Sequence, residues 1–177
     1  TIYDMIYPGM ADDAELVRFL SLKSREWKIS NDKSSLSKIR ENIEDNILRE
    51  IILACQNGKI RGNEGMTQGA MATAAVVLDS QEETPQALDW LFEPGKRGEG
   101  GGHIPAVFLG EVDRDGVGNE AAPGYCFGWM SNFRQCAKVL EADSKHRDYD
   151  LHRDFPRMKR MSATPYLLTT LDPYTPR

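Results

Sequence analysis

The sequence lacks an excess of basic charge, a long apolar run and a patterned set of cysteines. Its 177 residues carry a net charge of −5, which argues against a general nucleic-acid binder because phosphate affinity depends on clustered Lys and Arg. No apolar run is long enough to span a membrane, and no basic-then-apolar signal peptide opens the chain. We therefore predict neither a nucleic-acid nor a membrane partner. An anionic substrate stays compatible, since a cleft can be locally basic.

The cysteines are few and follow no metal-ligand spacing. Cys55 falls on the apolar face of an expected helix. We predict that Cys55, Cys126 and Cys136 are buried free thiols, in preference to a disulfide between Cys126 and Cys136. No metal and no cofactor is expected in this chain.

Strand-like alternation is also missing, whereas apolar residues recur at helical spacing. This pattern predicts a single all-α domain over residues 1–177, built of stacked helical hairpins with long polar connections and no visible repeat. Helices are expected at residues 12–29, 35–57, 66–78, 85–92 and 125–142, with a last helix between residues 145 and 160 and an extended end that Pro165, Pro173 and Pro176 punctuate.

Two of these expected helices indicate how the protein packs. The first, residues 35–57, has an apolar face at steps of three and four, and Gly58 stands where a left-handed cap would end the helix. That face consists of Leu36, Ile39, Ile43, Ile47, Ile51 and Cys55. The second, residues 66–78, is largely alanine, so its neighbours must approach closely and the helix is predicted to be central.

Residues 93–102 contain five glycines and a proline and are predicted to hold no regular structure. They lack the glycine spacing of a nucleotide-binding loop. A solvated loop and a flap that carries Lys96 and Arg97 toward an anionic ligand are both compatible with this composition.

Residues 59–68 form a hinge between the helices expected at residues 35–57 and 66–78, and this hinge is rich in polar residues. Gly62 and Gly65 allow a tight turn there. The turn would let Arg61, Asn63, Glu64 and Gln68 converge on one small volume. An ordinary helix-helix connection has a similar composition, so the hinge by itself is an ambiguous signal.

A second polar turn, residues 113–120, carries Arg114, Asp115 and Glu120 and is followed by Tyr125. If stacked hairpins place both turns on one rim, their side chains would face one cleft. A phenol beside a guanidinium loses its proton more readily and can exchange it near neutral pH. The alternative is that Tyr125 packs its ring in the core and hydrogen-bonds a carbonyl.

The two motifs read Lys-Ile-Arg-Gly-Asn-Glu-Gly-Met-Thr-Gln-Gly-Ala from residue 59 and Asp-Arg-Asp-Gly-Val-Gly-Asn-Glu-Ala-Ala-Pro-Gly-Tyr from residue 113. As a pair they resemble the heparinase II/III-like and alginate-lyase-like polysaccharide lyases, and the resemblance covers residues 40–177. It implies that the chain is part of an α/α toroid. The ending Pro173-Tyr-Thr-Pro176 is similar to the segment that leads toward the family's β-sandwich domain, which is not in this sequence.

The resemblance implies β-elimination at a uronic acid in an acidic polysaccharide. Asn63 would neutralise the uronate carboxylate, aided by Gln68 or Arg61, and Tyr125 would act as general base, general acid or both. Glu120 would orient a neighbour or a sugar hydroxyl, Trp129 would be a core residue or a sugar platform, and Glu64 and Arg114 would contact the substrate. Many relatives have a His after the Asn, where this chain has Glu64, and His103 is the candidate substitute.

The resemblance also implies a periplasmic or secreted protein whose partners are the acidic polysaccharide and the remainder of its own parent chain. Two other functions stay open. One is a carbohydrate-binding helical module without chemistry. The other is an α/α-toroid glycoside hydrolase that uses Glu64 or Glu120 as one of two carboxylates.

Overall fold

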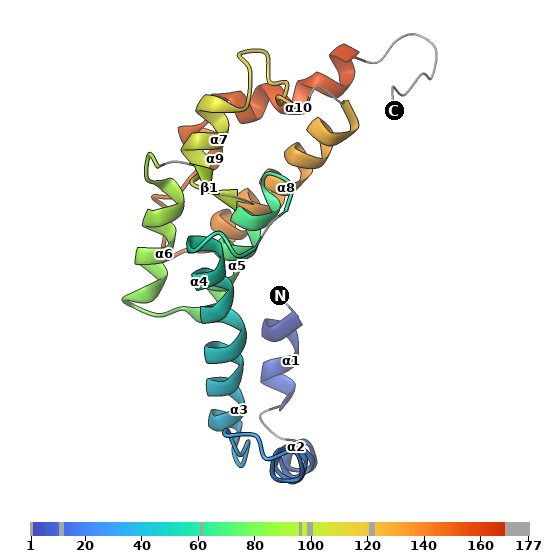
Figure 1. Cartoon of the computed structure of the whole chain (residues 1–177), viewed down its shortest axis with the longest axis vertical. Coiled ribbons are helices and arrows are strands. Elements are labelled where there is room, and N and C mark those ends of the chain that lie inside the picture. Colours follow the sequence, from blue (N-terminus) through green and yellow to red (C-terminus); the bar gives the residue numbers. More distant parts are fainter. Residues whose placement is uncertain are drawn as a thin grey trace. The chain divides into compact units, whose positions relative to one another are not determined.

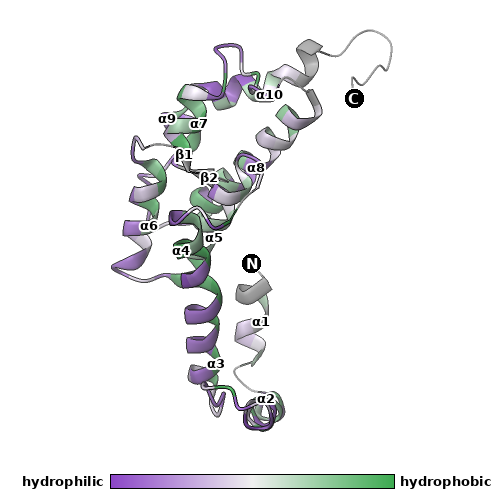
Figure 2. Cartoon of the chain, in the orientation of Figure 1, coloured by the Kyte–Doolittle hydropathy of each residue, from purple (hydrophilic) through white to green (hydrophobic). Residues whose placement is uncertain are grey.

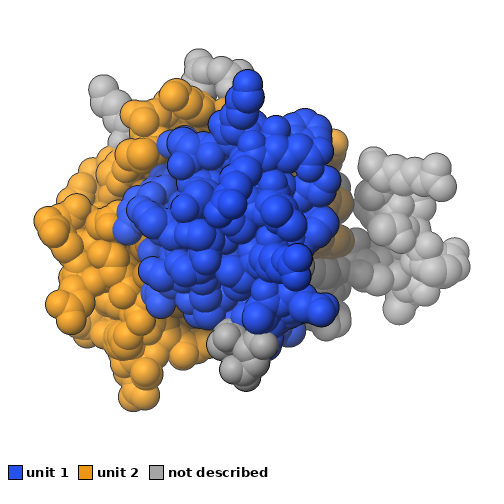
Figure 3. Space-filling view, turned by 90° about the horizontal axis from the view of Figure 1, so that it is seen from below, with its two compact units in different colours: residues 1–50 blue, residues 51–177 orange. Residues whose placement is uncertain are grey.

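The computed structural model describes residues 2–10, 13–60, 62–95, 97–98, 101–120 and 123–168. The chain forms two compact units, residues 1–50 and residues 51–177 (Figures 1 and 3). None of the described helices is both long and apolar enough to cross a membrane.

The first unit is made of α1 (Ile2–Met10), α2 (Ala14–Glu26), α3 (Leu36–Ile43) and the π-helical turn η1 (Glu44–Arg49). The carboxylate of Asp13 caps α2 by accepting the Leu16 N–H at 2.8 Å. The Ser35 hydroxyl caps α3 by accepting the Lys38 N–H at 3.2 Å. Both caps stand within one residue of the predicted helix starts.

The π turn corrects the predicted apolar face of the 35–57 helix. Ile39 is buried as expected, but Ile47 is 51% exposed and Leu48 takes its place at 8%. Hydrogen bonding from i to i+5 adds a residue to the turn, so the buried face moves to Leu48 and Ile52, while Cys55 is buried as predicted. Figure 2 shows the resulting ribbon, hydrophilic on one side and apolar on the other.

The second unit is also helical, and with the first it confirms the predicted all-α class. Its helices are α4 (Glu50–Gln56, which begins at the unit boundary), α5 (Met66–Leu78), α6 (Glu83–Phe92), α7 (Ile104–Gly110), α8 (Pro123–Ala142), α9 (Leu151–Asp154) and α10 (Pro156–Leu168).

Two details of the second unit differ from expectation. The glycine-rich segment, predicted to be irregular, contains an antiparallel pair of two-residue strands, β1 (Arg97–Gly98) and β2 (Gly101–Gly102). Glycine disfavours long strands but does not prevent a short backbone pairing. The end of the chain was expected to be extended from Pro165, yet α10 continues past it to Leu168. A proline removes one backbone donor, which bends or weakens a helix without always ending it.

α5 is the central helix of this unit, as its alanine content predicts. Met71, Ala72 and Ala75 are fully buried, and α8 and α6 both pack against α5. At Gly65 a Cβ would lie 2.7 Å from the Asn132 Cβ, and at Gly69 it would lie 3.7 Å from the Cys136 Cβ. A step of four residues along α5, from Gly65 to Gly69, matches a step of four residues along α8, from Asn132 to Cys136. α5 and α8 therefore run in the same direction, with their N-terminal ends on the same side.

The end of α4 and the cysteines agree with the sequence predictions. Gly58 has φ +65°, and the Lys59 N–H reaches back to the Ala54 carbonyl at 2.8 Å, which closes the helix with a left-handed glycine cap. All three cysteines are free and buried. Burial raises the pKa of the Cys136 thiol to about 12 and that of Cys55 to about 11, so both are protonated and unreactive at neutral pH.

Gly65→Ala should destabilise the second unit more than the matched change Gly69→Ala. Residue 65 has φ +84°, and a Cβ there would also meet the Phe133 amide nitrogen at 2.9 Å. Backbone strain and overpacking together predict a loss of about 2–4 kcal/mol in the free energy of unfolding. Gly69→Ala has ordinary contacts and should change it by less than about 1 kcal/mol. Urea denaturation of both variants measures this, and equal effects would contradict the packing argument.

Candidate functional site

A polar cluster closes the N-terminal end of α5. The Gln68 side chain is fully buried, accepts the Gly65 N–H at 2.8 Å and donates to the Glu64 carboxylate at 3.2 Å. Glu64 is itself only 2% exposed. Gln68 thereby satisfies a donor that would otherwise be left unpaired at the start of the helix.

The same turn is held from the other side by α8. The Asn132 amide Nδ2 donates to the Glu64 carbonyl oxygen at 3.1 Å, a contact between residues 68 positions apart. The Glu64 carbonyl and the Gly65 N–H belong to one peptide group. Side-chain amides therefore hold that peptide at both ends, Asn132 at the oxygen and Gln68 at the nitrogen.

Tyr125 lies on the stripe of α8 that also carries Asn132, the residue that contacts this turn. Seven residues separate it from Asn132, and positions i and i+7 of an α-helix share a face, about 10 Å apart along the axis. α5 begins at Met66, opposite Asn132, so α8 extends beyond it toward Tyr125. The Tyr125 side chain is 55% exposed, because this stripe lies beside the buried face of α8 and not on it.

The second predicted turn is anchored to the same end of α8. Val112 and Gly118 form an isolated β-bridge, and the Cys126 thiol donates to the Gly118 carbonyl at 3.5 Å. A Cβ at Gly118 would come within 2.9 Å of the Trp129 ring, so the turn lies flat against that indole. Trp129 is 1% exposed, which makes it a core residue and not a sugar platform.

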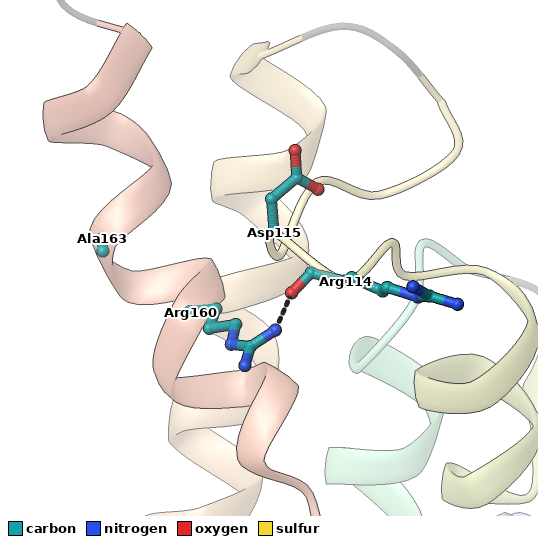
Figure 4. Close-up of a pocket in the computed structure, with 4 residues that line it drawn as sticks. All are labelled: Arg114, Asp115, Arg160 and Ala163. Atoms are coloured by element: carbon teal, nitrogen blue, oxygen red, sulfur yellow. Dashed lines mark hydrogen bonds between the residues drawn. The ribbon is translucent and has the colours of Figure 1, made fainter.

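α10 covers the other side of the second turn. Arg160 donates from its guanidinium to the Arg114 carbonyl, while the Arg114 guanidinium points away from Arg160 (Figure 4). Gly116 has φ +93° and its backbone lies directly against the α10 backbone at Arg160 and Met161. Arg114, Asp115, Arg160 and Ala163 line an open hollow of about 420 Å³.

The predicted site residues divide into buried and exposed sets. Glu64 and Gln68 are buried and hydrogen-bonded to each other, whereas Asn63, Arg114, Glu120 and Tyr125 are exposed. Both turns contact α8, so the two motifs meet on one helix. Arg61 and Lys96 lie outside the described residues. The roles of all these residues in binding or catalysis stay predictions.

His103 belongs to a different neighbourhood. Its Nδ1 hydrogen-bonds the Trp90 carbonyl at 2.5 Å, and the His103 and Trp90 rings lie 4.3 Å apart between centroids. Because a carbonyl only accepts, Nδ1 carries the proton and Nε2 is the nitrogen left for other contacts. The described side-chain contacts of His103 are with α6 and Gly95, and none joins it to the hinge.

Sequence reasoning missed Asn132 and Arg160. Asn132 lies two turns after Tyr125 on a helix whose face was predicted, so its spacing is the only available signal. Arg160 bonds a carbonyl 46 residues away, and no local pattern marks it. Among the described residues, no group of three or more His, Cys, Asp or Glu side chains is arranged to hold a metal ion.

The arrangement presents an exposed amide, Asn63, on the hinge and an exposed phenol, Tyr125, on α8, the helix that holds the hinge through Asn132. An amide can donate to a carboxylate, and a phenol can exchange a proton. Comparisons with protein-family models, with curated proteins and with solved structures find no match for this chain.

Proposed function

We propose that this chain is part of the catalytic region of a polysaccharide lyase, which cleaves a uronic-acid-containing polysaccharide by β-elimination. The proposal rests first on the paired motifs at residues 59–70 and 113–125. The observation that carries it is the position of Tyr125, exposed on the stripe of α8 that also carries Asn132, two turns before the residue that holds the Asn63–Met66 turn. A tyrosine that packed its ring in the core would be buried, whereas Tyr125 is 55% exposed.

In this reaction Asn63 donates hydrogen bonds to the uronate carboxylate and stabilises the negative charge that develops when C5 loses its proton. A donor placed where charge develops contributes about 3 kcal/mol to catalysis. Tyr125 takes the C5 proton, gives a proton to the departing glycosidic oxygen, or does both. The electron pair of the C–H bond becomes the new double bond of the unsaturated sugar as the C4–O bond breaks.

The surrounding residues take supporting roles in this proposal. Arg114 and Glu120 are exposed on the turn that lies against α8 and contact sugar hydroxyls or acidic groups. Arg61 adds positive charge at the hinge. Gln68 and Glu64 act through the backbone that they hold, since both are buried.

The same proposal makes the helices part of an α/α toroid in a periplasmic or secreted enzyme, with the remainder of the parent chain as the structural partner. Exposed apolar side chains in the first unit are consistent with a further helical layer. They include Phe19 at 55%, Leu22 at 54% and Trp27 at 73% exposure on or next to α2.

The reaction itself gives the first test. The full-length protein, incubated with alginate and with glycosaminoglycans, should produce ultraviolet-absorbing unsaturated sugars. Saturated products would indicate a glycoside hydrolase, and polymer that stays bound without being cut would indicate a binding module. Either result, or no interaction with any uronate polymer, overturns the lyase proposal.

Tyr125→Phe should abolish turnover while leaving polymer binding unchanged, because the ring stays and only the proton carrier is lost. The expected fall in kcat is at least about 10²-fold. Tyr149→Phe is the matched control, since the Tyr149 hydroxyl donates to Asp89 at 2.6 Å and its loss should leave kcat unchanged. A Tyr125→Phe variant that keeps full activity excludes Tyr125 as the proton carrier.

Asn63→Ala should lower kcat by about 10²-fold, since it removes a donor that strengthens in the transition state. KM should change much less than kcat. Asn46→Ala, at an exposed asparagine of η1, is the control and should behave as the parent protein. An Asn63→Ala effect confined to KM would show that Asn63 binds the substrate without stabilising the developing charge.

A further inference from the structure

We propose that Asn132 is a positioning residue that sets the place of Asn63 relative to Tyr125. The inference rests on the proposed lyase function and adds a residue that neither motif contains. Asn132 acts on the backbone of the hinge, through its hydrogen bond to the Glu64 carbonyl, and does not touch the substrate.

The backbone on the C-terminal side of Asn63 is held at three polar groups. The Asn63 carbonyl accepts the Met66 N–H at 3.0 Å. The following Glu64–Gly65 peptide group is held by Asn132 at its oxygen and by Gln68 at its nitrogen. Because this turn is fixed, the backbone position from which the exposed Asn63 side chain extends is also fixed.

Close packing prevents the turn from moving toward α8. The Gly65 Cα stands so near this helix that an added Cβ would lie 2.7 Å from the Asn132 Cβ and 2.9 Å from the Phe133 nitrogen. Movement away from α8 is opposed by the Asn132 hydrogen bond. The contact and the hydrogen bond together define one distance between the turn and the helix.

The hydrogen bonds of Asn132 and Gln68 have different effects on the proposed site. Gln68 belongs to α5 and holds a turn that leads into its own helix. Asn132 belongs to α8, the helix that carries Tyr125, so its hydrogen bond joins the two halves of the proposed site. Loss of Asn132 leaves the α5 cap in place but allows the Asn63 turn to shift relative to Tyr125. A displacement near 1 Å at a reacting centre can lower a rate by about 10²-fold.

A double-mutant cycle tests this inference in the full-length protein. Asn132→Ala should lower kcat about 10-fold with KM changed less than about 3-fold, as measured by formation of unsaturated sugar. In an Asn63→Ala background the same change should lower kcat less than about 2-fold, because there is no amide left to position. Asn132→Asp retains the side-chain size, cannot donate when ionised and should give the same result. It serves as the second variant if Asn132→Ala does not fold.

Thr84→Val is the matched control, since the buried Thr84 hydroxyl donates to the Ala75 carbonyl at 2.7 Å and joins α6 to α5 far from the hinge. It should lower stability without changing kcat. If Asn132→Ala costs the same in both backgrounds, or if it leaves kcat unchanged in an active enzyme, the positioning role is wrong while the lyase function stands. A parent protein without lyase activity overturns both.

Discussion

The close approach of α5 to α8 is the constraint on which the second unit depends. Gly65 and Gly69 bring the two backbones together, and the small side chains of Ala72 and Ala75 are fully buried further along α5. Because the helices run in the same direction, their N-terminal ends lie on one side. The Glu64–Gly65 peptide group of the hinge then lies against α8, and the turn at residues 113–120 contacts the same helix.

Local sequence signals predicted the helix bounds well where helix-ending residues stand at both ends. α5 begins after Gly65 and ends before Asp79, both of which have positive φ, so its bounds follow from residues that interrupt a helix. The π turn had no such signal. A helical pattern assumes a constant period, and the extra residue that exposes Ile47 and buries Leu48 becomes visible only when tertiary packing selects the face.

The sequence predicts the residues of the candidate site but not the long-range contacts between its segments. Asn63, Glu64 and Gln68 lie within one turn of chain, and composition alone brings them together. The hydrogen bonds of Asn132 to Glu64 and of Arg160 to Arg114 span 68 and 46 residues. No single sequence encodes such pairs in a local pattern, because they depend on how helices stack after each has formed.

The hinge also shows that polar residues that are close in sequence can have different structural roles. Gln68 and Glu64 are buried, and both ends of the Gln68 amide are engaged with the protein. An amide in that position cannot reorient toward a ligand without leaving the Gly65 N–H unpaired, which costs about 1–3 kcal/mol. The Asn63 side chain is exposed and does not hold the Gly65 N–H. Burial therefore separates the residues that hold the turn from the residue that the turn presents, and any part that Gln68 plays at the substrate must pass through Glu64 and Gly65.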